Sequence, residues 1–275
     1  MTRVLDIRPI GFIESPFETK NGTPRQPQLV SSATCRLKFS HERLAHPEHA
    51  LEGIDAYSHV WVLFYFHQDA SVERLSEPVK SKVTPPKLGG QKCGLFATRT
   101  PQRPNAIGLS LVEVDRVEHD VLHLRGADLV DGTPVLDVKP FLPHIDKPQT
   151  SVGCTERVEV QALMPSWLAS SVNDERPLQV SYTGRAYRML ETVFAEGRSP
   201  ESHCQTLLDL RSLVSEILAG DPRSLYRKDK CSDRLYFLEL DGLHVTDFRN
   251  GCSTSPQPRN ERGNVNTATN GFSQI

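Results

Sequence analysis

The sequence predicts a mainly β protein, an antiparallel barrel or sandwich of about 150 residues followed by a small α+β unit. Three observations support this prediction. Short segments alternate apolar and polar residues, and turn-forming residues separate them. No helical segment between them is long enough to connect parallel strands. The 20 Pro and 17 Gly among 275 residues favour loops and short strands, so an all-helical fold is not expected.

The first strands are predicted from their hydrophobic period. Residues 34–39, TCRLKF, place Cys35, Leu37 and Phe39 on one face, the pattern of a half-buried strand. Residues 59–67, HVWVLFYFH, are apolar throughout, which predicts a central strand buried on both faces. Residues 94–110, GLFATRTPQRPNAIGLS, begin and end like strands and enclose a polar, proline-restricted turn.

Three more strands are predicted after Ile107. The first ends at a polar turn over residues 118–120, and the second ends at a turn over residues 131–134. A third strand follows that turn. Residues 155–164, TERVEVQALM, are expected to close the series.

The character of the chain changes near residue 165. Leucine, valine and isoleucine recur at helical spacing over residues 207–218 after Ser199-Pro200-Glu201, which predicts a capped helix that ends at Gly220. Residues 234–248, RLYFLELDGLHVTDF, predict a hairpin that turns at Asp241 and Gly242. We therefore expect a barrel domain over residues 1–164, an α+β domain over 165–250, and a disordered polar tail over 251–275.

Composition excludes several protein classes. Arg3, Asp6 and Arg8 interrupt the apolar N-terminus, so neither a signal peptide nor a membrane span is predicted; a cytoplasmic protein is expected, with nuclear presence left open. The six cysteines are scattered without zinc-binding spacing, which favours free thiols. Neither G-x-G-x-x-G nor a Walker A pattern occurs, so the usual nucleotide sites are absent.

Positive charge is concentrated in two places although the net charge is −2. Residues 78–112 hold no Asp or Glu and six basic residues: Lys80, Lys82, Lys87, Lys92, Arg99 and Arg103. Such a segment attracts phosphate, although a solvated basic loop has the same composition. A second cluster combines Arg223, Tyr226, Arg227, Lys228 and Lys230, which suits phosphates and a stacked base unless it is only a solvated loop at a helix end.

Five segments in order resemble the TsaA-like domain of the TrmO family. They are GFIESPF, GTPRQPQL, YSHVWVLFYFHQ, PPKLGGQKCGLFATRTPQRPNAIGLSLVEV and DLVDGTPVLDVKPFLPHID, and ILAGDPRSLYR resembles the family's C-terminal signature. The resemblance implies an S-adenosylmethionine-dependent methyltransferase acting on N6 of threonylcarbamoyladenosine (t6A) beside the anticodon of tRNA. It also implies a cofactor pocket in the barrel and a homodimer with sites near the subunit interface.

Carried over by position, the resemblance implies ten cofactor contacts: Pro24, Arg25, Gln26, His67, Gln68, Arg99, Leu109, Ala127, Asp128 and Leu129. Arg25 and Arg99 can offer forked donors to a carboxylate. Asp128 can accept hydrogen bonds from hydroxyl or ammonium groups. No metal is implied.

The catalytic base is left open among Asp137, Lys139 and His67. A base or strong orientation is expected because the target nitrogen, between a purine ring and a carbonyl, is a poor nucleophile. The expected tRNA contacts are Lys80, Lys82, Lys87, Lys92, Arg103, Arg223, Tyr226, Arg227 and Lys228. Of Arg103 and Asn105, one is expected to brace the turn and the other to face substrate.

Other functions remain open on sequence alone. The same barrel could serve as a non-catalytic RNA- or protein-binding module, which would not need Arg99, Leu109 and Asp128 together. On a buried apolar strand, His67 is also compatible with a purely structural histidine. A metal-dependent hydrolase using His41, with His46 and His49, is a third hypothesis, although regular ligand spacing is missing.

Overall fold

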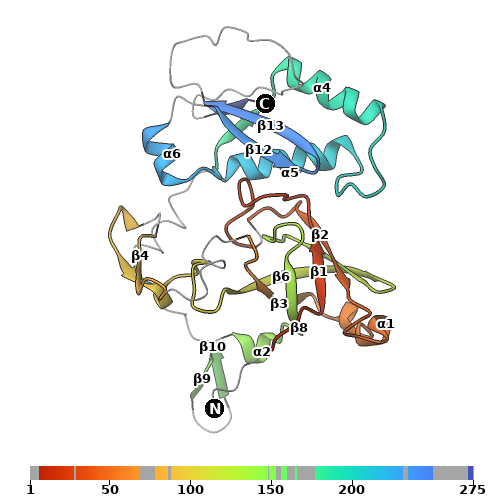
Figure 1. Cartoon of the computed structure of the whole chain (residues 1–275), viewed down its shortest axis with the longest axis vertical. Helices are drawn as coiled ribbons and strands as arrows, with labels where there is room; N and C mark the ends of the chain where they lie inside the picture. Colours follow the sequence, from red (N-terminus) through yellow and green to blue (C-terminus); the bar gives the residue numbers. More distant parts are fainter. Residues whose placement is uncertain are drawn as a thin grey trace.

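The protein consists of a closed β-barrel and an α+β domain that rests on one end of it (Figure 1). The structure is a computed structural model. It describes residues 6–27, 29–68, 78–85, 88–147, 149–152, 156–159, 165, 177–231, 235–249 and 272–274.

Six antiparallel strands form the barrel: β1 (Gly11–Glu14), β2 (Thr34–Phe39), β3 (His59–Tyr65), β6 (Ile107–Glu118), β7 (Val121–Arg125) and β8 (Pro134–Pro140). Their order is β1-β2-β7-β6-β3-β8, and β8 pairs with β1 to close the barrel. The mainly β class and the turns at residues 118–120 and 131–134 are confirmed.

The barrel strands alternate between an inner and an outer face. Cys35, Leu37 and Phe39 are buried as predicted. The prediction that residues 59–67 are buried on both faces is wrong for this chain. In β3 only Val60, Val62 and Phe64 are buried, and the intervening residues are half-exposed. The reason is that a barrel strand has only one inner face.

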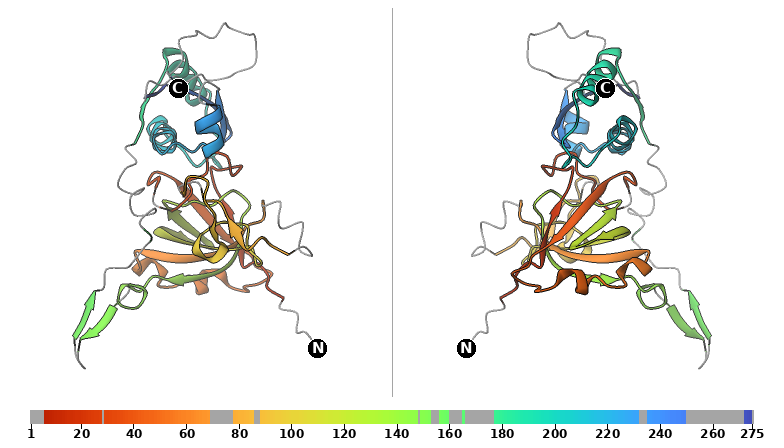
Figure 2. Two further views of the ribbon diagram at one scale, coloured as in Figure 1. Left: turned by 90° about the vertical axis from the view of Figure 1, so that its left-hand side faces the viewer. Right: turned by 90° about the vertical axis from the view of Figure 1, so that its right-hand side faces the viewer.

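Two further sequence predictions were wrong. Residues 155–164 do not close the barrel: β10 (Glu156–Glu159) pairs with β9 (Gln149–Val152) in a separate hairpin, and residues 160–164 lie outside the described residues. Figure 2 shows this hairpin projecting from the barrel. Leu95–Ala97 form a short 3₁₀ helix, η4, after the two-residue strand β5 (Cys93–Gly94), which pairs with β4 (Lys82–Val83).

Three short elements lie at the barrel end opposite the α+β domain: α1 (Pro47–Ala50), η1 (Ile54–Ala56) and α2 (Pro143–Asp146) (Figure 1). Among the described residues, none forms a helix with the length and apolarity needed to cross a membrane.

In the part of the C-terminal domain that the structure describes, there are a four-stranded sheet and three helices. The sheet order is β11 (Gln179–Ser181), β14 (Phe272–Gln274), β13 (Leu243–Arg249), β12 (Tyr236–Leu240). The helices are α4 (Gly184–Ala195), which the sequence reading missed, α5 (Leu207–Ala219) and α6 (Leu225–Lys230). The hairpin turn is confirmed, since Asp241 and Gly242 both have positive φ.

Helix α5 ends near Gly220 as predicted but begins differently. Its cap is Thr206, whose side chain accepts from the Asp209 amide while the Asp209 carboxylate accepts from the Thr206 amide. Ser199-Pro200-Glu201 is therefore not the cap. In the tail expected to be disordered, Phe272–Gln274 instead form β14, between β11 and β13. Residues 160–164 and 166–176 are not described, so the boundary at residue 165 stays a prediction.

The loop between β1 and β2 joins the two domains. In this loop, the side chains of Phe17, Val30 and Ala33 are buried in the same cluster as the α5 and β12 residues of the C-terminal domain. The Asp241 amide donates to the Pro16 carbonyl at 2.8 Å, and the Asn21 side-chain amide donates to the Phe237 carbonyl at 2.8 Å. The β1–β2 loop is thus part of the C-terminal core.

Candidate functional site

The candidate cofactor residues gather at one end of the barrel, called here the rim. Strands β1, β3 and β7 end at the rim, and β2, β6 and β8 begin there. The rim therefore collects the β1–β2 loop, the residues after β3, the turn before β6 and the β7–β8 loop. These segments hold nine of the ten residues carried over from the family motif, and the tenth, Leu109, lies near the start of β6. The C-terminal domain rests on the same end (Figure 1).

Hydrogen bonds tie several of these residues to the β1–β2 loop. Arg99 Nη1 donates to Gln26 Oε1 at 2.8 Å. Gln68 Nε2 donates to the Glu18 carbonyl at 3.2 Å. Arg25 Nη2 donates to the carbonyl of Arg223 in the C-terminal domain at 2.9 Å. Of the two arginines suited to a carboxylate, Arg99 thus bonds to the Gln26 side chain and Arg25 bonds to the C-terminal domain.

Asp128 is a partly buried acid of the rim. Its Oδ1 accepts a hydrogen bond from Ser110 Oγ at 2.6 Å. Burial raises the pKa of the Asp128 carboxyl to about 6, and the hydrogen bond from Ser110 and the charge of Arg99 partly oppose this rise. Ala127 and Leu129 are buried in the barrel core, so only their backbone groups can meet a ligand.

His67 stands at the rim beside Asp131. Burial lowers the pKa of His67, and Asp131 only partly offsets that effect, so the imidazole is neutral at pH 7. The Asp131 carboxylate also accepts from the Ser15 amide at 2.9 Å, which fixes the β7–β8 loop against the end of β1.

Asp137 and Lys139 lie elsewhere, on the outer face of β8. Their side chains form an ion pair of 2.8 Å. Asp137 pairs in register with Leu63, which pairs on its other side with Leu109. Within the described residues, no hydrogen bond or ion pair joins His67 to either of them. The three candidate bases therefore do not form one cluster.

The outer face of β3 and β6 is apolar. Cross-strand pairs join Trp61 with Leu111, Leu63 with Leu109, and Tyr65 with Ile107. Leu109 is 52% exposed in the single chain. Ile107 is 38% exposed, and the other four side chains are partly exposed. A continuous apolar face of this kind on a sheet is typical of a surface that another molecule covers.

The turn before β6 is braced by Arg103. Its Nη1 donates to the Thr98 carbonyl at 2.9 Å, and its guanidinium lies 5.5 Å from the centre of the Phe96 ring. We expected one of Arg103 and Asn105 to brace this turn, and Arg103 is the one that does so. Lys80, Lys82 and Lys92 are exposed, and Lys87 lies outside the described residues.

Comparison with known proteins places this geometry in a family. The model of the tRNA-methyltransferase O N-terminal domain matches residues 12–147. The tRNA (adenine(37)-N6)-methyltransferase of Escherichia coli is 38% identical over 245 residues, which cover 86% of this chain and 89% of that protein. This chain belongs to the tRNA-methyltransferase O family.

Other members of the tRNA-methyltransferase O family agree. The rat tRNA (adenine(37)-N6)-methyltransferase is 42% identical over 170 residues, 62% of this chain, but the match spans only 38% of the rat protein. A solved structure of TrmO from Pseudomonas aeruginosa superposes with a TM-score of 0.60 at 30% identity, covering 90% of this chain and 93% of that one.

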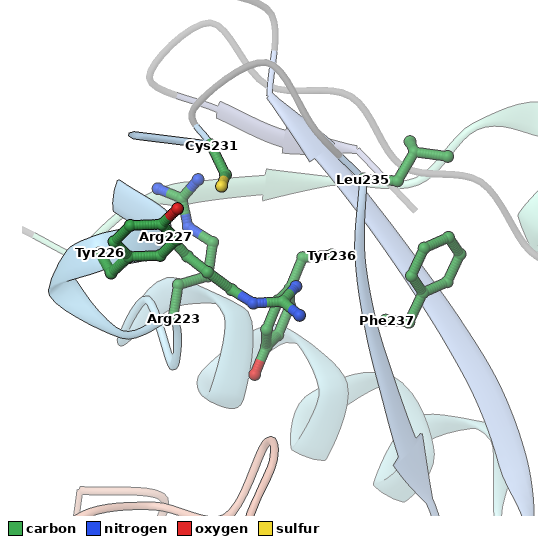
Figure 3. A pocket seen from close by; sticks show the side chains of 7 residues that line it. All are labelled: Arg223, Tyr226, Arg227, Cys231, Leu235, Tyr236 and Phe237. Atoms are coloured by element: carbon green, nitrogen blue, oxygen red, sulfur yellow. The ribbon is translucent and has the colours of Figure 1, made fainter. Parts of the chain in front are cut away.

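The tRNA-methyltransferase O model ends before the C-terminal domain, which has a pocket of its own of about 350 Å³ between α6 and β12 (Figure 3). It is lined by Arg223, Tyr226, Arg227, Cys231, Leu235, Tyr236 and Phe237. Tyr226 is 70% exposed, whereas Arg223 is buried and ion-paired with Asp221. Of the predicted tRNA contacts here, Tyr226 and Arg227 are thus accessible and Arg223 is structural.

The histidines weighed as metal ligands lie far from the rim. His46, Glu48 and His49 bring their ligand atoms within 4.8 Å of one another, all exposed, at the opposite end of the barrel. His41 instead contacts Asp120 at 3.0 Å. Cys35, Cys93, Cys204 and Cys231 are free thiols; Cys154 and Cys252 lie outside the described residues.

Sequence reasoning missed Ser110, Asp131 and Asp221. Ser110 had a detectable signal, because it is the polar member of an inward series with Gly108 and Val112 on β6. Asp131 was interpreted as a plain turn residue, yet it faces His67. The sequence could not connect Asp221 to the rim, because the connection runs through Arg223, whose carbonyl bonds to Arg25 198 residues away.

Proposed function

We propose that this chain is an S-adenosylmethionine-dependent methyltransferase that methylates N6 of t6A beside the anticodon of tRNA. One observation carries the proposal: Gln26, Arg99 and Asp128 come from three separate segments and meet at the rim, and Arg25 adjoins Gln26. The E. coli relative, matched over 89% of its length, is named for methylation of adenine 37 in tRNA. A Pseudomonas aeruginosa relative is named as a putative S-adenosylmethionine-dependent methyltransferase.

The donors and acceptors at the rim fit this cofactor. Arg25 and Arg99 can bind a carboxylate through paired N–H donors. Asp128, ionised at pH 7, can accept from hydroxyl or ammonium groups. Leu109 contributes an exposed apolar wall and backbone groups on β6. The cofactor supplies an activated methyl group, and the rim residues hold it in line with the attacking nitrogen.

The base must take the proton that N6 loses as the new N–C bond forms and the C–S bond breaks. His67 is the best placed of the three candidates, because it is neutral at pH 7 and lies at the rim. Asp137 is engaged in an ion pair with Lys139 on the outer wall. We therefore assign proton acceptance to His67. Asp137 and Lys139 are assigned a role in orienting the substrate.

Two positive surfaces suit the RNA. Lys80, Lys82 and Lys92 are exposed near the turn before β6. In the C-terminal domain, Arg227 lines the pocket, and Lys228, next to it on α6, forms an ion pair of 3.3 Å with Asp221. Lysine and arginine bind phosphate without reading sequence, while an exposed ring such as Tyr226 can stack on an unpaired base. Arg103, engaged in bracing the turn, acts on RNA only indirectly.

We also propose that the protein is a homodimer joined through the outer face of β3 and β6. Ile107 and Leu109 are the exposed centre of that face, half-exposed Leu63 lies beside Leu109, and burying the three would also close the wall beside the cofactor. Leu63→Lys should shift the mass in solution from two chains to one, measured by light scattering. A wild-type chain that is monomeric at micromolar concentration would contradict this assembly. The cytoplasmic location stays a prediction.

The activity is tested with labelled cofactor and tRNA that carries t6A. Label should enter the RNA, and tRNA lacking the threonylcarbamoyl group should receive none. Arg99→Ala should abolish or greatly weaken cofactor binding in calorimetry, whereas Arg43→Ala, an exposed arginine at the opposite barrel end, should not. Binding of tRNA without binding of cofactor would instead support the non-catalytic binding module.

A further inference from the structure

We propose that the turn Asp221-Pro222-Arg223 of the C-terminal domain is a positioning device for Arg25, so that cofactor affinity in the barrel depends on a salt bridge outside it. The inference rests on the proposed function in one respect: it takes Arg25 as a cofactor contact. It assigns a role at the rim to Asp221 and Arg223, neither of which belongs to the barrel.

The turn is closed on itself. Asp221 has a φ of 45°, in the left-handed region. Its carboxylate accepts from Arg223 Nε at 2.8 Å and from Arg223 Nη2 at 3.2 Å, and the Arg223 side chain is only 6% exposed. A bidentate pair of this kind fixes both partners in orientation. The turn that joins them is therefore held in one conformation, and so is the Arg223 carbonyl that directly follows it.

That carbonyl is the acceptor for Arg25. The Arg25 Nη2 donates to it at 2.9 Å, across 198 residues of sequence. The neighbouring Gln26 side chain in turn donates to the Arg25 carbonyl and accepts from Arg99. With one fork nitrogen anchored, the plane of the Arg25 guanidinium is set before any ligand arrives, which lowers the ordering cost of binding.

A second anchor of the same loop provides the comparison. Glu216 on α5 accepts from the Ser32 amide at 3.1 Å and from the Ser31 hydroxyl at 3.4 Å. It joins the C-terminal domain to the β1–β2 loop but has no bond to Arg25. A change at Glu216 therefore tests general loop attachment, and a change at Asp221 tests the orientation of Arg25.

The experiment uses the full chain and S-adenosylmethionine in calorimetry. Asp221→Asn removes the charge while asparagine still tolerates the left-handed backbone. We expect cofactor to bind about 3- to 10-fold more weakly, the effect of one lost positioning hydrogen bond. Glu216→Gln should leave the affinity unchanged, because it alters the loop attachment and not the acceptor of Arg25. If Asp221→Asn does not fold, Arg223→Lys replaces it, because lysine keeps the charge and loses the fork.

A double-mutant cycle separates positioning from general stability. In an Arg25→Ala background, Asp221→Asn should cause no further loss of affinity, because the group it positions is gone. Two results would overturn this inference and leave the proposed function standing. One is that the two substitutions cause additive losses of affinity. The other is that Arg25→Ala weakens cofactor binding while Asp221→Asn leaves the affinity unchanged. Unchanged affinity in Arg25→Ala overturns the cofactor role of Arg25 together with the inference.

Discussion

Asp128 is subject to two opposing requirements. Burial disfavours its charge and raises the pKa of its carboxyl to about 6, whereas accepting hydrogen bonds from a cofactor requires the ionised form. Ser110 and Arg99 only partly offset the burial. The carboxyl therefore changes charge close to neutral pH, where a surface aspartate would stay ionised.

Cofactor affinity should therefore fall as the pH is lowered from 7 to 5, because the protonated Asp128 no longer accepts. The Asp128→Asn variant should bind the cofactor weakly, and its affinity should no longer depend on pH between 7 and 5. Calorimetry at several pH values measures both. A wild-type affinity that is constant between pH 7 and 5 would show that Asp128 does not contact the cofactor as a carboxylate.

The stability of the cofactor-free chain should respond in the opposite direction. The native pKa of Asp128 lies above its ordinary value of 3.8, so between pH 4 and 6 the native state binds more protons than the unfolded state. The stability that Asp128 contributes is therefore present at low pH and is lost as the pH rises through 6. Urea unfolding of wild type against Asp128→Asn isolates this contribution.

At the scale of single strands, Gly108 lets Phe64 fill the barrel. The two residues pair across β3 and β6, and a Cβ atom on Gly108 would lie 2.2 Å from the Phe64 ring. No such contact is tolerable, so either the ring or the strand must move. Because Leu109 and Ser110 come next on β6, such a movement would reach the rim.

Gly108→Ala should therefore destabilise the protein by about 1–3 kcal/mol. Gly94→Ala is the matched control, since a Cβ there meets nothing within 4 Å and its backbone is extended. Denaturant unfolding compares the two. Equal stabilities for the two variants would mean that Phe64 can leave its position at no cost.

Local patterns predicted most strands and turns, and they failed where partners are distant. The alternation in residues 34–39 and the Asp241-Gly242 turn depend on neighbouring residues alone, and both are confirmed. The N-terminus of α5 was misplaced because two polar segments compete, and the capping box at Thr206 and Asp209 is the stronger one. Residues 155–164 alternate like a barrel strand, but their partner is β9.

At the scale of the whole molecule, the family motif identified the rim residues but not what holds them. The β1–β2 loop was interpreted from its sequence as a proline-containing ligand loop. Its buried residues Phe17, Val30 and Ala33 show that it also forms part of the C-terminal core. Contacts across about 200 residues leave no periodic pattern, so sequence reading could not find them.

Phe17→Ala should consequently affect both domains. We expect a loss of about 3–5 kcal/mol, as for other buried aromatic side chains, together with weaker cofactor binding because the loop loosens. Phe12→Ala, a phenylalanine of β1 that is 49% exposed, is the control. If Phe17→Ala costs stability but leaves cofactor affinity at the wild-type value, the loop keeps its shape without the C-terminal core.

The shared core also determines when the site can be completed during synthesis on the ribosome. Asn21 forms a hydrogen bond with Phe237, which is 216 residues later, and Arg25 forms one with Arg223. Neither bond can form before its C-terminal partner has been synthesised. At roughly 5–20 residues per second, translation takes about 10–40 s to make these partners. Through that interval the nascent barrel carries Phe17 and Val30 uncovered, so the growing chain is exposed to aggregation until its last strands emerge.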